Sequence, residues 1–289
     1  MVRRTLTIHD HRRELAQNRY VYAVLSRRSG GVSIGINLNP DKVCNFDCIY
    51  CQVDRSTPGR FGKVDLRILE EELRDILARA KSGELFDHPP FSDIPESLRY
   101  VKDISFSGDG EPTTYPRFKE TVKLAIRLKK EVGLGHLKIV VITNATMFHR
   151  PKLQETLALL DQHNGEIWAK LDAGTEAYYH LVDVTTIPFR RVLDNIREAA
   201  RRRPVVIQGL FMRVHGVGPD GKEIEAFCDR LREIVAQGGK ISLVQVYTVA
   251  RRPAQPYVTP LSDAEVDSIA EAVRRIPLPV ASFYSGQDV

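Results

Sequence analysis

The feature that most limits how this chain can fold is a regular alternation of short β-branched runs with longer amphipathic segments. In these segments, apolar residues recur at the spacing of one helix face, as Phe189, Val192 and Ile196 do. Strands are expected over residues 32–38, 101–106, 138–142, 167–171, 205–211 and 241–249. Helices are expected over residues 65–81, 116–131, 151–162, 186–202, 222–237 and 263–275.

Six strand-then-helix units in succession predict a parallel sheet with right-handed crossovers. Because a closed barrel of this kind needs eight units, the sequence predicts an open, curved sheet with helices outside, a partial (β/α)6 TIM barrel of the α/β class. Residues 31–289 would form this single domain, and the Arg- and His-rich residues 1–30 a basic N-terminal extension. In such sheets, chemistry takes place in the loops at the carboxyl ends of the strands.

Composition narrows the classes of function. The longest apolar runs, such as Ile139–Ile142, are far too short to span a membrane. No apolar stretch follows Met1-Val2-Arg3-Arg4 as it would in a secretory leader, so a cytoplasmic location is expected. The net charge of +5 would suit an anionic partner such as RNA, but arginine-rich helix faces in solvent produce the same balance and are the favoured explanation.

The cysteines point to a metal site. Cys44, Cys48 and Cys51 crowd into eight positions after the first expected strand, which in a reducing compartment indicates metal binding rather than disulfides. Zinc sites usually need four ligands, and no histidine lies nearby, so a zinc knuckle or chance clustering is the weaker alternative. Three thiolates can hold a 4Fe-4S cluster and leave the fourth iron open to a substrate or cosubstrate. Cys228 lies on the apolar stripe of a predicted helix and is expected in the core.

Polar residues also follow the next strands. The second expected strand leads into Gly108, Asp109, Gly110 and Glu111, and the third ends in Thr143 and Asn144. Glycines allow close backbone approach to a ligand, and a carboxylate can accept a hydrogen bond from a cationic amine. The fourth strand ends in Lys170 and Asp172, which strand alternation places on one side. An ionisable pair inside a parallel sheet is costly unless its members meet a ligand or each other, so a cofactor contact and a structural salt bridge are both open.

The spacing C-x3-C-x2-C, with Tyr50 just before the last cysteine, closely resembles the signature loop of the radical SAM superfamily. The resemblance implies that Cys44, Cys48 and Cys51 bind a 4Fe-4S cluster whose open iron chelates the amino and carboxylate groups of S-adenosylmethionine. One electron, delivered by an external donor of the flavodoxin or ferredoxin type, would break the sulfonium bond. A 5′-deoxyadenosyl radical would then abstract a hydrogen atom from the substrate.

The loop from Gly108 to Glu111 is similar to the superfamily's Gly-Gly-Glu motif, which holds the methionine amino group. One related branch carries the form Gly-Asp-Gly-Glu-Pro-Thr, with Asp109 in place of a glycine, as here. By the same resemblance, Tyr50 would lie against the adenine, and polar residues at the next strand ends would bind the ribose hydroxyls and the methionine carboxylate. The implied cofactor contacts are Tyr50, Gly108, Asp109, Gly110, Glu111, Thr143, Asn144, Lys170 and Asp172.

A wider set of stretches resembles a radical SAM group related to the four-demethylwyosine synthases, which modify a guanosine in transfer RNA. The stretches are residues 44–55, 107–116, 170–175, 244–253 and 260–263. The archaeal wyosine enzymes use three further cysteines upstream for a second cluster, and this chain has no cysteine before Cys44, which argues against wyosine synthesis. The substrate stays open between RNA or a nucleotide and a small metabolite or peptide. A non-catalytic metal-binding protein ranks last, because it would not need polar residues at these strand ends.

Overall fold

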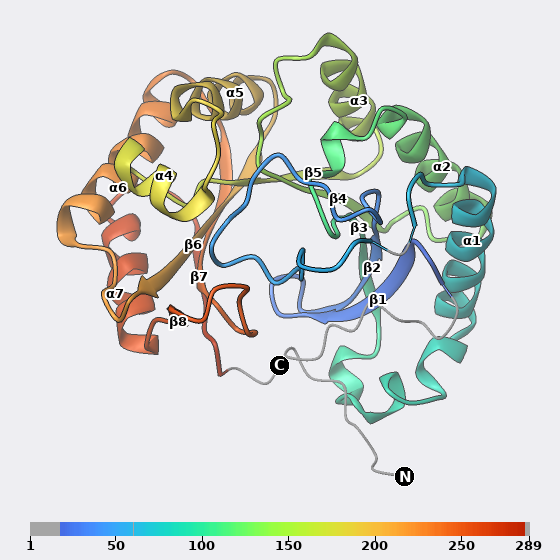
Figure 1. Cartoon of the computed structure of the whole chain (residues 1–289). Coiled ribbons are helices and arrows are strands. Elements are labelled where there is room, and N and C mark those ends of the chain that lie inside the picture. Colours follow the sequence, from blue (N-terminus) through green and yellow to red (C-terminus); the bar gives the residue numbers. More distant parts are fainter. Residues whose placement is uncertain (1–17, 60, 287–289) are drawn as a thin grey trace.

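The computed structural model describes residues 18–59 and 61–286, in which the β-branched runs form one curved sheet (Figure 1). The strands are β1 (Val21–Ser26), β2 (Gly31–Ile36), β3 (Val101–Phe106), β4 (Lys138–Thr143), β5 (Gly165–Lys170), β6 (Val205–Val214), β7 (Ile241–Thr248), β8 (Val258–Pro260) and β9 (Val280–Phe283). Their order is β1-β2-β3-β4-β5-β6-β7-β9, and β8 pairs with β6 outside this path. From β2 to β9 the neighbours along this path run parallel, whereas β1 is antiparallel to β2.

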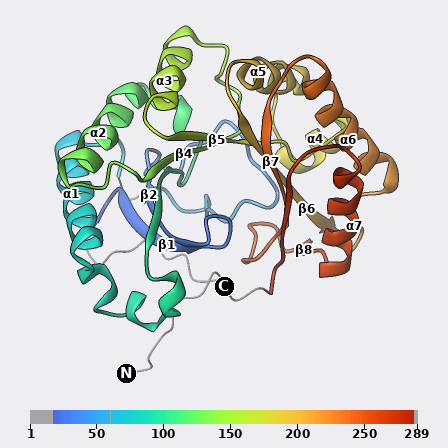
Figure 2. The ribbon, with the colours of Figure 1, turned by 180° about the vertical axis from the view of Figure 1, so that it is seen from behind.

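Helices follow the strands and cover the outer face of the sheet (Figure 1, Figure 2). They are α1 (Leu66–Ser82), α2 (Phe118–Glu131), α3 (Pro151–Asp161), α4 (Glu176–Asp183), α5 (Phe189–Arg202), α6 (Gly221–Ala236) and α7 (Asp263–Arg274). Short 3-10 segments lie at η1 (Glu84–Phe86), η2 (Phe91–Asp93), η3 (Glu96–Leu98) and η4 (Pro112–Thr114). Because β1 and β9 form opposite edges of the sheet, the barrel stays open along one side. The predicted partial TIM barrel is confirmed.

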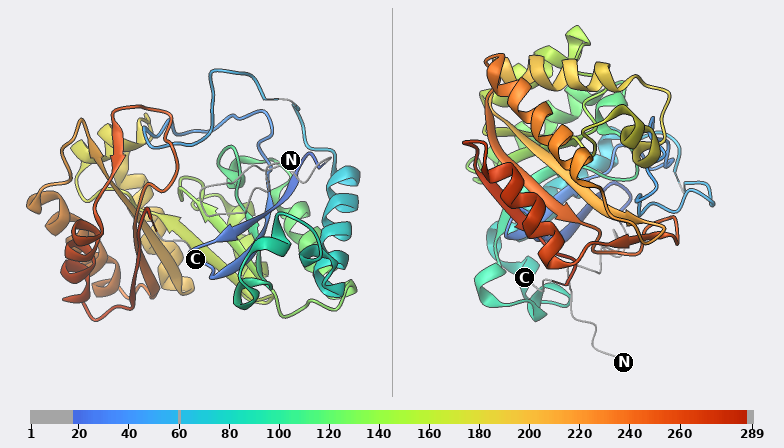
Figure 3. Two further views of the ribbon diagram at one scale, coloured as in Figure 1. Left: turned by 90° about the horizontal axis from the view of Figure 1, so that it is seen from below. Right: turned by 90° about the vertical axis from the view of Figure 1, so that its left-hand side faces the viewer.

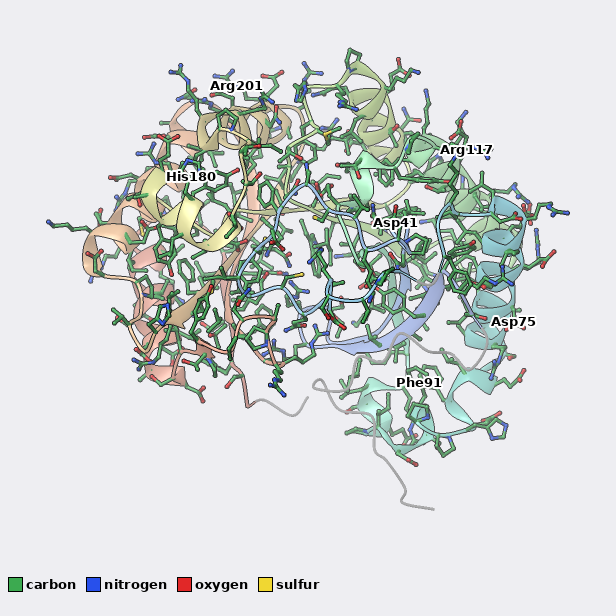
Figure 4. The ribbon with its side chains drawn as sticks, viewed as in Figure 1. Asp41, Asp75, Phe91, Arg117, His180 and Arg201 are labelled. Carbon is green, nitrogen blue, oxygen red and sulfur yellow. The ribbon has the colours of Figure 1, made fainter. Side chains whose placement is uncertain are left out.

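The core lies between the sheet and the apolar stripes of the helices. In α5, Phe189, Val192 and Ile196 are buried, each contributing roughly 1.5–3 kcal/mol, while most of its arginines face solvent. Arg201, on this helix, lies at the outer edge of the molecule (Figure 4). Cys228 is 0% exposed and packs within the same core, which confirms its prediction. Among the described residues, no helix combines the length and the apolar character that a membrane span requires.

The N-terminal boundary differs from the prediction of an extension through residue 30. Val21–Ser26 form β1, which pairs with β2 along its whole length, from Val21↔Ile36 to Ser26↔Gly31. The run is apolar and buried at all but its last residue, like the predicted strand β2, but basic residues flank it on both sides and give the segment the composition of an extension. Residues 1–17 of the predicted extension lie outside the described residues.

Three further elements, α4, β8 and β9, were not predicted. With eight, three and four residues, they are too short to show a clear hydrophobic period. The first of them, α4, begins at the N-cap Thr175, whose side chain accepts a hydrogen bond from Tyr178 N. Its last residue, Asp183, lies beside Cys48 of the cysteine loop, here residues 41–52, so the missed helix contributes to the site.

Candidate active site

A cavity of about 300 Å³ runs along the concave side of the sheet. Its wall comes from the β1–β2 hairpin, the loops after β2, β3 and β4, and the inner faces of β5, β6 and β7. All but one of the predicted site residues line it: Cys44, Cys48, Tyr50, Cys51, Gly108, Asp109, Gly110, Glu111, Thr143, Asn144 and Lys170. The exception, Asp172, is buried next to Lys170. The parallel topology thus brings together loops that are far apart in the sequence.

The cysteine loop crosses the concave side of the molecule, where its residue Asp41 is labelled in Figure 4. It is anchored to the end of α4, because Ile49 N donates a hydrogen bond to Val182 O at 3.0 Å. Cys51 N donates to Cys48 O at 2.9 Å and closes a tight turn. The backbone therefore fixes the last two cysteines relative to each other.

Arg55 joins the cysteine loop to the loop that follows β3, residues 107–111, which we call the glycine loop. Its Nη1 donates to Cys51 Sγ at 2.7 Å, its Nη2 to Asp109 O at 3.0 Å, and its Nε to Lys42 O at 3.1 Å. A single guanidinium group therefore fixes the positions of Lys42, Cys51 and Asp109 relative to one another. Its positive charge lies directly beside one of the three sulfur atoms.

The donor set fits a cluster better than a single metal ion. All three thiols are partly buried, and burial raises the pKa of Cys44 and of Cys48, so these thiols stay protonated unless a metal binds them. Within residues 18–59 and 61–286, no three cysteine, histidine or carboxylate side chains are arranged to hold one metal ion. A 4Fe-4S cluster takes each thiolate on a different iron, so its ligands lie farther apart than those of a single ion.

The two glycines of the loop after β3 are required by close packing. A Cβ on Gly108 would lie 2.4 Å from Asn37 Oδ1, and a Cβ on Gly110 would lie 2.1 Å from Val43 O. Asn37 also accepts a hydrogen bond from Asp109 N at 3.1 Å and donates one to Asp109 Oδ2 at 2.6 Å. The glycine loop therefore presses directly on the chain that leads into the first cysteine.

Glu111 ties the end of β3 to the end of β4. Its Oε1 accepts hydrogen bonds from Thr143 Oγ1 at 2.7 Å and from Thr113 N and Oγ1 at 3.1 and 2.5 Å, and its Oε2 accepts one from Asn144 N at 2.7 Å. Burial raises the pKa of Glu111, and these donors oppose the shift. Thr143, predicted as a cofactor contact, thus also orients this carboxylate. Oε2, with one donor, keeps the capacity to accept a ligand amine.

Lys170 and Asp172 form the ion pair that was one of the two open alternatives. Lys170 Nζ lies 3.0 Å from Asp172 Oδ2 and donates to Tyr247 OH at 3.0 Å. Asp172 also accepts hydrogen bonds from Leu210 N at 2.8 Å and from Tyr50 OH at 2.5 Å. Burial alone would lower the pKa of Lys170, but Asp172 and Tyr247 outweigh burial and raise it. Because Lys170 still lines the cavity, the pair does not exclude contact with a ligand.

Asp183 adds a second buried carboxylate to this network. Its Oδ1 accepts hydrogen bonds from Tyr50 OH at 3.2 Å and from Cys48 Sγ at 3.5 Å. Burial, and then the charge of Asp172, raise the pKa of Asp183 to about 8. The hydroxyl of Tyr50 is thus directed at two aspartates, while its ring lies 4.9 Å from Lys170 Nζ. Tyr50 therefore links the cysteine loop to β5 as well as lining the cavity.

Sequence reasoning missed Asn37, Arg55 and Asp183. Asn37 directly follows β2, but the strand expected over residues 32–38 includes it, so it is not among the polar residues expected at strand ends. Arg55 lies close after the last cysteine of the loop, but a single arginine in a polar segment carries no clear signal. Asp183 is the last residue of α4, a helix too short to be recognised in the sequence. Only the folded structure shows that it contacts Tyr50 and Cys48.

The family model of the Radical SAM superfamily matches residues 38–231, a span that includes the cysteine loop, the glycine loop and Lys170 with Asp172. The chain belongs to the radical SAM superfamily. This superfamily consists of iron–sulfur enzymes, so the resemblance inferred from the cysteine spacing is confirmed.

Relatives of this radical SAM chain include proteins of different length. It is 26% identical over 249 residues to a UPF0026 protein of Helicobacter pylori, covering 84% of the chain and 70% of that protein. It is 24% identical over 259 residues to a protein named GTPase Obg of Brachyspira hyodysenteriae, covering 88% of the chain. The chain spans only 33% of the length of this second relative.

Solved structures share the fold of this radical SAM chain. A radical SAM methyltransferase from Sphaerobacter thermophilus has a TM-score of 0.64 at 14% identity, covering 95% of this chain and 72% of that one. TYW1 with a lysine–pyruvate adduct bound has a TM-score of 0.56 at 14% identity, covering 89% of this chain and 84% of that one. At the level of the fold, the expected relation to the wyosine synthases is therefore confirmed.

Proposed function

We propose that this chain is a radical SAM enzyme that binds one 4Fe-4S cluster through Cys44, Cys48 and Cys51 and binds S-adenosylmethionine in the adjoining cavity. The observation that carries the proposal is that three thiols and the polar ends of β3, β4 and β5 line one cavity. When bound, the cluster and S-adenosylmethionine would supply a 5′-deoxyadenosyl radical for hydrogen abstraction. An external electron donor of the flavodoxin or ferredoxin type belongs to the same proposal.

The chain's own residues would bind and orient these groups. Arg55 holds Cys51 Sγ and the carbonyl of Asp109 at once, so it would keep the cluster and the glycine loop at a constant separation. Gly108 and Gly110 let the loop after β3 pack close to the cysteines, with its backbone at the cavity wall. Glu111 Oε2 would accept a hydrogen bond from the methionine amine, which is the role proposed for this carboxylate.

Lys170 and Tyr50 would form a further part of the cavity wall, with Asp172 buried beside Lys170. Lys170 is the cationic group of this wall, and its pairing with Asp172 keeps the net local charge near zero before a ligand binds. Tyr50 lines the cavity, and its hydroxyl is held by Asp172 and Asp183. This arrangement suits a flat, polar ligand such as an adenine nucleoside stacked on the tyrosine.

Anaerobic reconstitution tests the proposal. We expect close to four irons and four sulfides per chain, and 5′-deoxyadenosine when dithionite and S-adenosylmethionine are added. Replacing Cys44, Cys48 or Cys51 by Ala should remove the visible absorption of the cluster. Cys228→Ala is the matched control and should keep it, because Cys228 is buried in the core away from the cavity. Stoichiometric zinc without labile sulfide would contradict the proposal.

A further inference from the structure

The cavity extends beyond the residues that the cluster and S-adenosylmethionine would need. Toward the β1–β2 hairpin its wall includes, beside apolar and aromatic side chains, the polar residues Ser26, Arg27, Arg28, Ser33, Ser105 and Gln208. The inside of a barrel of this kind is normally filled with bulky branched side chains. Arginine, serine and glutamine side chains at such inner positions, next to the proposed cofactor site, therefore point to a polar ligand.

Arg28 reaches from the hairpin across the inner face of the sheet. The centre of its guanidinium lies 5.6 Å from the ring of Trp168 and 5.0 Å from the ring of Tyr247. Trp168 lies on β5 and Tyr247 on β7, and β6 runs between these two strands. The guanidinium therefore lies over β6, where Gln208 lines the cavity. The two aromatic rings hold the cation by cation–π attraction and leave its N–H groups available.

Gln208 brings an unsatisfied polar atom to the same place. Its side chain is completely buried, and its Nε2 donates to Gln245 Oε1 at 2.6 Å. Its own Oε1 is buried and has no hydrogen-bond partner in the part of the chain that the structure describes. An acceptor left unpaired in the interior is costly, so its place in a cavity wall indicates that a ligand supplies the donor.

Arg27 and Arg28 bring two positive charges to the same end of the cavity. Arg27 donates through Nη1 to Tyr284 O, just after β9, so it bridges the open side of the barrel between the two edges of the sheet. Figure 3 shows these two ends of the sheet, blue and red, facing each other across the opening. Burial, and then the charge of Arg28, lower the pKa of Arg27 to about 10. Neither arginine forms an ion pair with a described carboxylate, so an anion in the cavity would meet two positive charges that no such carboxylate balances.

We propose that Arg27, Arg28 and Gln208 form the substrate subsite, and that they bind a small organic anion, a carboxylate or a phosphate, which also carries a hydrogen-bond donor. The planar fork of an arginine matches either oxyanion through paired N–H···O bonds. Gln208 Oε1 accepts the donor of the same molecule. The inference rests on the proposed function, because it places the substrate in the cavity that S-adenosylmethionine would share.

Calorimetric titration of the reconstituted chain with saturating S-adenosylmethionine tests the subsite. The probes are L-lactate and inorganic phosphate, which separate the two sources of the anion, and propionate, which matches lactate without its hydroxyl. Ionic strength is held constant, because added salt screens charges. We expect lactate or phosphate to bind with a dissociation constant on the order of 1 mM, and lactate to bind more tightly than propionate.

Trp168 reports where the probe binds, because it is the chain's single tryptophan and lies against Arg28. Its fluorescence should change saturably with the same dissociation constant. Arg28→Met should weaken binding at least tenfold. Arg28→Gln keeps a planar group on the two rings without the charge and should show the same loss, so the result does not depend on how well the methionine variant folds. Arg190→Met, whose parent side chain is 91% exposed on α5, is the control and should bind as the parent does.

Three results would overturn the subsite: no saturable response to lactate or phosphate in the parent, equal affinity in Arg28→Gln, or loss of S-adenosylmethionine affinity in that variant. The last of these would place Arg28 in the cofactor site instead. Iron, sulfide and S-adenosylmethionine binding are measured on the same samples. If the parent assembles no cluster and binds no S-adenosylmethionine, the proposed function fails, whatever the anion titrations show.

Discussion

Replacing Asp172 by Asn distinguishes a structural role of the Lys170–Asp172 pair from a role in ligand binding alone. The side chains of Asp172 and Lys170 are 1% and 19% exposed, and Lys170 Nζ lies 3.0 Å from Asp172 Oδ2. The substitution leaves a largely buried ammonium without its counter-charge, which typically costs about 3–5 kcal/mol of unfolding free energy. Because Lys170 borders a cavity that water can enter, we expect the lower end, about 3 kcal/mol.

Urea unfolding of the cluster-free chain, followed by circular dichroism, measures this loss. A loss of about 3 kcal/mol corresponds to a fall of roughly 6–12 °C in melting temperature for a chain of this size. The double variant Asp172→Asn/Lys170→Met removes both charges and should recover at least half of the loss. Glu155→Gln breaks the exposed pair with Lys119, whose side chains are 61% and 41% exposed, and should cost less than about 1 kcal/mol.

A structural role of the pair is contradicted if the free energy of unfolding of Asp172→Asn lies within about 1 kcal/mol of that of the parent and the double variant is no more stable than the single one. A titration with S-adenosylmethionine should then show the loss in affinity instead. If stability falls by the expected amount while affinity for S-adenosylmethionine stays normal, Lys170 and Asp172 are scaffold and leave the list of cofactor contacts.

Three further substitutions test the other walls of the cavity. Glu111→Ala removes the acceptor of four hydrogen bonds and should lower both the melting temperature and the affinity for S-adenosylmethionine, with the cluster spectrum retained; unchanged affinity would contradict the assignment of this carboxylate. Arg55→Met removes the donor to the Cys51 sulfur, so a redox titration should show a lower midpoint potential, because a cation and a hydrogen bond at the sulfur stabilise the reduced cluster. Gly110→Ala would place a Cβ 2.1 Å from a backbone oxygen of the cysteine loop and should reduce the iron bound per chain, whereas Gly62→Ala, with open space around it, should not.

Most of the regular structure could be predicted from local pattern. The strand expected over residues 101–106 is β3, Val101–Phe106, and the helix expected over residues 151–162 is α3, Pro151–Asp161. Both have a clear period and a distinct boundary, such as the proline that begins α3. By contrast, β1 is a short run between basic residues, and α4 is only eight residues long and too short to show a clear period.

That polar strand ends gather follows from the sequence alone, because parallel strands place their carboxyl ends along one edge and the chain puts thiols, glycines and charges there. Which of these groups meet depends on the tertiary structure. Tyr50 OH and Asp183 are 133 residues apart in the chain yet 3.2 Å apart in space, and Arg28 lies against rings from two other strands. Such contacts depend on the curvature of the sheet and the packing of its loops. No spacing or motif in the sequence indicates them.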